Sequence, residues 1–146
     1  MKREIKFRAK DKRSGEWCIG ELHLLSRVPH IHINLDVLSS IPIDPDTVGQ
    51  FTGLKDINGK EIYEGDIVDV AVSPINYVGK DPTPYHRICV CVYQKENAAF
   101  IYERAGKNYK RKLSRNWKYK VMGSYDIQNT EIIGNIHDNP ELLKGE

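Results

Sequence analysis

The chain has 146 residues, 40% hydrophobic and 29% charged, with a net charge of +2. These proportions are ordinary for a folded domain and exclude a disordered chain. The densest apolar run, residues 67–72, contains a carboxylate and is far shorter than the roughly 20 residues of a membrane-spanning helix. Three cysteines, an odd number, and an N-terminus without an apolar signal core predict reduced thiols and a cytoplasmic location.

Apolar and polar residues alternate along most of the chain, which is typical of half-buried strands. Turns are expected at residues 11–15, at Asn58-Gly59 and at residues 95–97, and a long loop at residues 73–85, which contain three prolines. Helical spacing is limited to a possible short helix over residues 109–117 and one turn at residues 140–144. We therefore predict a mainly β protein with strands at residues 5–7, 17–19, 30–35, 62–72, 87–93, 98–102, 117–121 and 130–136.

Residues 50–68 contain the most informative local pattern. Thr52-Gly53 and Asn58-Gly59 bracket what we interpret as a compact polar loop, and Gly65-Asp66 precedes an apolar, β-branched strand. We expect a positive φ at Gly65 and an Asp66 carboxylate that accepts a backbone N–H across the turn. Such a turn is typical of the opening strand of a small SH3-like barrel.

The same segment holds four carboxylates, Asp56, Glu61, Glu64 and Asp66. Four carboxylates could bind a hard cation or act in acid–base chemistry. The alternative is that they cap turns, pair with lysines and solvate the loop. We favour the alternative because the spacing of a calcium-binding loop is absent.

Two long motifs resemble one protein family. Residues 51–68, FTGLKDINGKEIYEGDIV, and residues 132–143, IIGNIHDNPELL, closely resemble the YopX family, small proteins of bacterial chromosomes, prophages and phages. Residues 3–11 resemble the N-terminus of the family as well. The resemblance implies an N-terminal β extension (residues 1–49), an SH3-like barrel (residues 50–146) and oligomers. It carries no established activity and no catalytic residues.

Cysteines and histidines suggest a second hypothesis, a zinc site. Cys89 and Cys91 should face one side of a strand, as should His30 and His32, and two thiolates with two imidazoles complete a tetrahedral site. The cysteine spacing differs from that of a zinc knuckle, and strand cysteines are mostly small buried hydrophobes. We therefore expect no metal.

Residues 104–120 contain eight lysines or arginines and no acid, while the rest of the chain carries 14 basic and 20 acidic side chains. This basic segment could neutralise phosphates and stack on bases. Alternatively, its aromatic residues pack inward while its lysines protect an edge strand, or it docks on the acidic body of a neighbouring subunit. The candidate nucleic-acid-binding residues are Lys107, Lys110, Arg111, Lys112, Arg115, Trp117, Lys118 and Lys120.

The sequence lacks a nucleophile elbow and a phosphate-binding glycine loop. We therefore expect a non-enzymatic, homo-oligomeric β protein of phage or mobile-element origin that serves as an interaction or scaffold module. The alternative is a nucleic-acid-binding accessory protein that uses residues 104–120. We expect no cofactor and no membrane partner, and the sequence identifies no small-molecule substrate.

Overall fold

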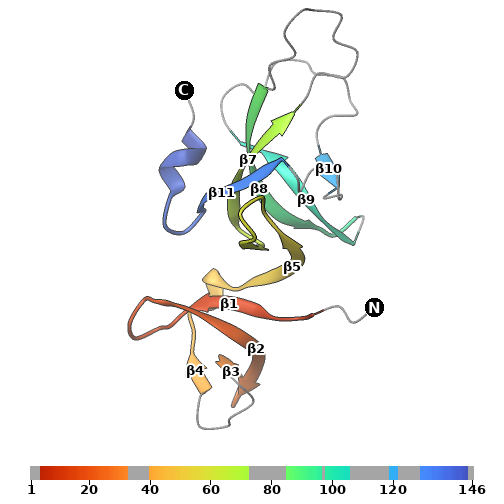
Figure 1. Ribbon diagram of the computed structural model, residues 1–146. Coiled ribbons are helices and arrows are strands. Elements are labelled where there is room, and N and C mark those ends of the chain that lie inside the picture. Colours follow the sequence, from red (N-terminus) through yellow and green to blue (C-terminus); the bar gives the residue numbers. More distant parts are fainter. Residues whose placement is uncertain are drawn as a thin grey trace, which may run out of the picture. The chain divides into compact units, whose positions relative to one another are not determined.

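The computed structural model describes residues 4–32, 40–72, 85–96, 98–105, 119–121 and 129–144 (Figure 1). β-strands dominate these residues, and their helical parts are two short 3-10 turns, η2 (Pro45–Thr47) and η5 (Pro140–Lys144). The predicted mainly β class is therefore confirmed. Within the same residues no helix is long and apolar enough to cross a membrane. Contacts divide the chain into two compact units, Met1–Gly53 and Leu54–Glu146.

The first sheet has the strand order β4-β3-β2-β1-β5-β6. β5 continues from the first unit into the second and was expected to be part of a polar loop. It is a strand instead, because Gly53 accommodates a φ of +86° without ending it. The strands of this sheet are β1 (Phe7–Lys10), β2 (Trp17–Leu25), β3 (Val28–His32), β4 (Ser40–Pro42), β5 (Gly49–Lys55) and β6 (Glu61–Tyr63).

β2 changes partner at Gly20. Residues 17–20 pair with β1, whereas residues 21–25 pair with β3. A Cβ at Gly20 would overlap the carbonyl oxygen of His32 and come within 2.9 Å of the Ile31 side chain. Only glycine leaves enough room for the backbone of β3 to pass this closely.

The first unit buries one face of its sheet. Alternation along β1, β2 and β3 directs one set of apolar side chains inward, and Thr47 connects η2 to β1. Its Oγ1 accepts a hydrogen bond from the Lys10 amide at 2.9 Å and donates one to the Asp44 carbonyl at 2.7 Å. The buried cluster consists of Ala9, Cys18, Ile31 and Ile43, against which Phe7, Leu22, Ile41 and Val48 pack.

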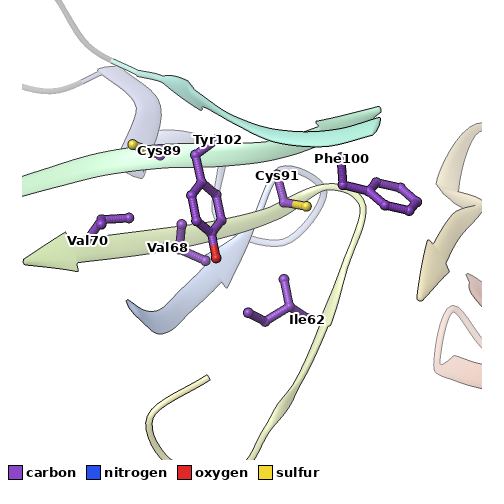
Figure 2. Close-up of a cluster of buried hydrophobic side chains, with 7 residues drawn as sticks. All are labelled: Ile62, Val68, Val70, Cys89, Cys91, Phe100 and Tyr102. Carbon is purple, nitrogen blue, oxygen red and sulfur yellow. The ribbon is translucent and has the colours of Figure 1, made fainter. Parts of the chain in front are cut away.

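The second sheet has the order β10-β9-β8-β7-β11 and supplies most of the core of the second unit, to which Ile62 of β6 also belongs. Figure 2 shows its buried side chains, Ile62, Val68, Val70, Cys89, Cys91, Phe100 and Tyr102. β11 carries a bulge between Ile132 and Gly134. The strands are β7 (Asp66–Val72), β8 (Tyr85–Gln94), β9 (Ala99–Arg104), β10 (Tyr119–Val121) and β11 (Thr130–Asn135).

The predicted SH3-like barrel is not confirmed, since the described strands form two antiparallel sheets and not a closed barrel. Closure requires the first and last strands of a sheet to pair with each other. Here β10 pairs with β9 and β11 pairs with β7, so the two strands lie at opposite ends of an open antiparallel sheet. The structure therefore has two open sheets.

Candidate functional site

Asp56 is the first carboxylate of the 50–68 motif, and its side chain is buried. Its Oδ1 accepts hydrogen bonds from the amides of Asn58 and Lys60, both at 2.9 Å. Its Oδ2 accepts one from the Ile132 amide on β11 at 3.0 Å. Both oxygens are thus engaged by backbone donors, which confirms the turn-capping interpretation for this residue.

Gly65 and Asp66 form the turn between β6 and β7 as predicted. Gly65 has a φ of +89°, and Asp66 Oδ2 accepts the Tyr63 amide at 2.7 Å. The Gly65 amide donates to the Cys91 carbonyl at 2.8 Å, and its carbonyl accepts the Ile136 amide at 2.9 Å. One residue therefore joins the β6–β7 turn to β8 and to the turn after β11.

The two glutamates of the motif have separate surroundings. Glu61 Oε2 accepts a hydrogen bond from the Tyr63 hydroxyl at 3.0 Å. Burial raises the pKa of the Glu64 carboxyl. Among the described residues, no three His, Cys, Asp or Glu side chains form a group that could hold a metal ion. The hypothesis of a cation site in this motif therefore finds no support in the structure.

The second motif secures the turn that follows β11. Asn135 Oδ1 accepts the amides of His137 and Asp138 at 3.0 and 2.9 Å. Asn139 Oδ1 accepts the Asn135 amide at 3.3 Å. A Cβ at Gly134 would lie 2.6 Å from that same oxygen, so a side chain at this position would displace Asn139. Both motifs thus stabilise backbone turns.

The zinc hypothesis built on Cys89 and Cys91 receives no support from the structure. Both thiols are reduced and buried in the core of the second unit, in agreement with their interpretation as small hydrophobes. His30 and His32 belong to the first unit. The described part of the chain contains no cluster of these four side chains.

Most of the basic segment lies outside the described residues. This applies to Lys107, Lys110, Arg111, Lys112, Arg115, Trp117 and Lys118, and to the possible helix over residues 109–117. Lys120 is on β10, in register with Tyr102 of β9. Nucleic-acid binding through these residues stays a prediction.

The described residues contain a second basic and aromatic group, on the first unit, that sequence patterns did not reveal. The Lys6 ammonium lies 4.8 Å from the centre of the Phe51 ring. Arg8 and Lys10 lie 4.8 and 5.4 Å from the centre of the Trp17 ring. Strand alternation on β1 places the three cations on one side, and the contact of each with a ring contributes about 0.5–1 kcal/mol at an exposed site.

A hollow of about 600 Å³, lined in part by Lys6, lies within the first unit. A cluster of three histidines from β2 and β3 also lies on this unit, and His32 belongs to both features. The pairing of β2 with β3 brings the histidines together. This hairpin was not recognisable from the sequence, because its turn, Ser26-Arg27, lacks the Asn or Gly that usually marks such turns. The hollow is lined by Glu4, Ile5, Lys6, Ile19, Gly20, Glu21 and His32.

The fold and the motifs define an all-β protein with two open antiparallel sheets and glycine- and carboxylate-dependent turns. The YopX protein family model matches residues 6–144, and the chain belongs to the YopX family. Among solved structures, the crystal structure of protein EF1440 from Enterococcus faecalis is similar, with 28% sequence identity and a TM-score of 0.49. The match covers 98% of this chain and 100% of that one. No curated protein matches the chain.

Proposed function

We propose that this protein is a non-catalytic interaction module of phage or mobile-element origin that assembles into homo-oligomers. The observation that carries the proposal is a group of exposed apolar side chains on the β2–β3 hairpin. Leu24, Leu25 and Val28 have exposed fractions of 68%, 44% and 42%. Neighbouring apolar side chains exposed in this way are typical of surfaces that bind another protein.

The hairpin turn supports the same interpretation. Ser26 and Arg27 have φ values of 51° and 68°, a conformation that non-glycine residues adopt at an energetic cost. Leu25 and Val28 are paired directly across the strands at this turn. The turn therefore holds apolar side chains at the end of a hairpin, where a second copy of the chain could bury them.

Sheet edges and charge distribution also favour self-association. The outer strands in the described sheets are β4 and β6 in one and β10 and β11 in the other. Outer strands have backbone groups that can pair with another chain. The basic segment and the acidic remainder of the chain carry opposite charge, which favours contact between copies.

We propose a non-catalytic protein because two carboxylates of the 50–68 motif are hydrogen-bonded to the backbone. Asp56 and Asp66 accept hydrogen bonds from backbone amides within turns. A carboxylate that serves as a turn cap is poorly placed to move protons to or from a substrate. The most distinctive residues of the chain thus support its architecture.

The test is the mass of the full chain in solution, measured by light scattering for a hairpin variant and a matched control. The variant is Leu24→Ser with Val28→Ser, and the control is Ile57→Ser with Ile133→Ser, at side chains that are also exposed. We expect the wild type and the control to form oligomers and the hairpin variant to have a lower mass, with all three equally folded. Equal masses for the variant and the control would overturn the assignment of the hairpin.

A second candidate function, nucleic-acid binding, is favoured by the concentration of eight basic residues within residues 104–120. The test uses a fluorescent single-stranded oligonucleotide and the triple variant Lys110→Glu, Arg111→Glu and Lys112→Glu. A control reverses three exposed charges elsewhere, Lys12, Arg13 and Lys95. If the segment binds phosphates, affinity falls steeply with salt and is lost in the first variant alone.

If the same triple variant instead lowers the oligomer mass and binding is absent, the basic segment is a subunit contact. A variant that changes neither property would indicate a segment that only covers an edge strand. Trp117→Ala separates the remaining alternatives. An inward Trp117 costs about 3–5 kcal/mol of stability when truncated, whereas a stacking Trp117 loses affinity with little loss of stability.

A further inference from the structure

One face of the first sheet carries a row of three cations. Phe7 and Ala9 of β1 lie on the side of the buried cluster of the first unit. Successive strand residues project to opposite sides, so the residues that alternate with them lie on the other face of the sheet. These residues are Lys6, Arg8 and Lys10, and all three side chains are partly exposed.

β2, the neighbour of β1 in this sheet (Figure 1), adds apolar and aromatic surface to the same face. Trp17 is the cross-strand partner of Lys10, and Ile19 is the partner of Arg8. Directly paired residues of antiparallel strands lie on the same side of a sheet. Trp17 is partly exposed and Ile19 is 44% exposed. The face therefore combines positive charge with a planar ring and an apolar side chain.

β3 extends this face with a histidine ring. His32 pairs with Glu21 of β2, and Ile31 beside it belongs to the buried cluster on the opposite side. Lys6, Ile19 and His32 all line the hollow of about 600 Å³. His32 Nε2 is buried and has no hydrogen-bond partner among the described residues. A ligand in the hollow could supply that partner, which a buried polar atom normally has.

The chemistry of this face fits a single-stranded nucleic acid. Cations two residues apart on a strand are separated by about 7 Å, close to the spacing of successive phosphates in an extended single strand. Proteins that bind single strands combine such cations with rings on which bases stack. The hollow has the volume of a small-molecule pocket, and the carboxylates of Glu4 and Glu21 in its lining accept hydrogen bonds from the amino group of a base.

We propose that this face of the first sheet binds single-stranded nucleic acid, with phosphates along Lys6, Arg8 and Lys10 and one base in the hollow. Lys6 forms an ion pair with Glu4 at 3.0 Å, and Glu4 is exposed. An exposed ion pair contributes little to stability, so a phosphate can replace this carboxylate. The face is separate from the basic segment 104–120, and its ligand does not depend on the proposed self-association.

The direct test is fluorescence anisotropy of a labelled single-stranded DNA of about 12 nucleotides, titrated with the full chain. Contacts with three phosphates predict that log K falls against log salt with a slope of about −2. We expect an affinity lower by about tenfold or more in the triple variant Lys6→Gln, Arg8→Gln and Lys10→Gln. The matched control removes three exposed cations of the same unit, Lys12→Gln, Arg13→Gln and Arg27→Gln. Absence of binding by the wild type, or equal loss in the control, would overturn the proposal.

Competitors identify the class of ligand. A duplex keeps its bases stacked and a polyglutamate has none, so each should bind about tenfold or more weakly than the single strand. Equal affinity for either competitor would contradict a site for single strands. The variant Lys110→Glu, Arg111→Glu and Lys112→Glu should retain binding. Loss of binding in that variant alone would assign the single strand to the basic segment and overturn the proposal.

A further measurement on the wild type does not depend on variants that fold. A single strand that carries iodouracil is cross-linked to the protein by light, and the linked peptides are identified by mass spectrometry. We expect cross-links within residues 4–32, at Trp17 or His32. Cross-links confined to residues 104–120 would contradict the assignment of the first sheet.

Discussion

At the scale of single residues, a few buried polar groups determine how the turns of the second unit are built. Asp56 joins its own loop to β11 through three backbone amides, and the residues involved are up to 76 positions apart in the sequence. Hydrogen bonds to an ionised carboxylate each contribute about 1.5–3 kcal/mol. Loss of this side chain leaves several amides without a partner.

Asp56→Ala is therefore expected to lower the free energy of unfolding by about 2 kcal/mol or more. The measurement is chemical denaturation followed by circular dichroism. Asp46→Ala, at an exposed aspartate, serves as the control and should change stability by no more than about 0.5 kcal/mol. Similar losses in the two variants would show that the contacts of Asp56 are not a major source of stability.

Gly65 has a left-handed backbone conformation, with a φ of +89°. A β-branched side chain is strained there, so Gly65→Val should destabilise the protein by more than about 1 kcal/mol. Gly65→Asn should recover part of that loss, since asparagine tolerates positive φ better than valine. Thermal melts in which valine and asparagine behave like the wild type would remove the role assigned to this turn.

Glu64 gives a prediction about pH. Burial raises the pKa of its carboxyl in the folded protein, so the folded state binds this proton more tightly than the unfolded chain does. The contribution of Glu64 is therefore most favourable below its unfolded pKa and is lost as pH rises through its folded pKa. The stability of Glu64→Gln relative to the wild type should increase between about pH 4 and pH 6. A constant difference over that range would contradict the direction of the shift.

At the scale of elements, β2 is the strand on which the first unit depends. It pairs with β1 and with β3 on either side of Gly20, where no space for a Cβ exists beside the His32 carbonyl. On its other side β3 is paired with β4. The bend therefore depends on the absence of a side chain at one position.

Gly20→Ala should destabilise the first unit by about 1–3 kcal/mol, the usual cost of inserting a methyl group into a filled space. Hydrogen exchange provides the measurement, because it reports on β2 and β3 separately from the second unit. We expect faster exchange for the amides of β2 and β3 and little change in β7 and β8. Unchanged protection of β2 and β3 would show that the strands separate easily at this point.

Much of the fold was predictable from local pattern. Alternation located the strands near Trp17, Ile67 and Val90, and glycine chemistry predicted the turn at Gly65. β5 was missed because Gly53 resembles a turn residue, and β4 because three residues are too few to show a period. The arrangement of the described strands in two open sheets depends on pairing between distant strands, which no local pattern reports.

In the candidate sites, too, local contacts were predictable from the sequence and contacts between distant residues were not. The role of Asp66 within its turn followed from the sequence, whereas the bond between Asp56 and Ile132 joins distant parts of the chain. His30 and His32 were recognisable as a pair from their spacing. Their partner His23 was not recognisable. It pairs with His30 through a hairpin whose turn, Ser26-Arg27, has two positive φ values but no Asn or Gly to mark it in the sequence.

At the scale of the whole molecule, the central proposal is self-assembly. Of the nine large apolar side chains that are exposed among the described residues, five lie between Ile5 and Val28. Apolar contacts between copies are insensitive to salt, whereas contacts through the basic segment weaken as salt increases. The two modes of assembly can therefore be distinguished by the salt dependence of the mass.

The most direct measurement is sedimentation of the wild-type chain from low to high micromolar concentration, at low and at high salt. We expect a mass that is a multiple of the 16.8 kDa of one chain and that persists at high salt, as apolar hairpin contacts require. A multiple that disappears at high salt would assign the assembly to the basic segment. A mass of one chain at every concentration and salt would contradict self-assembly.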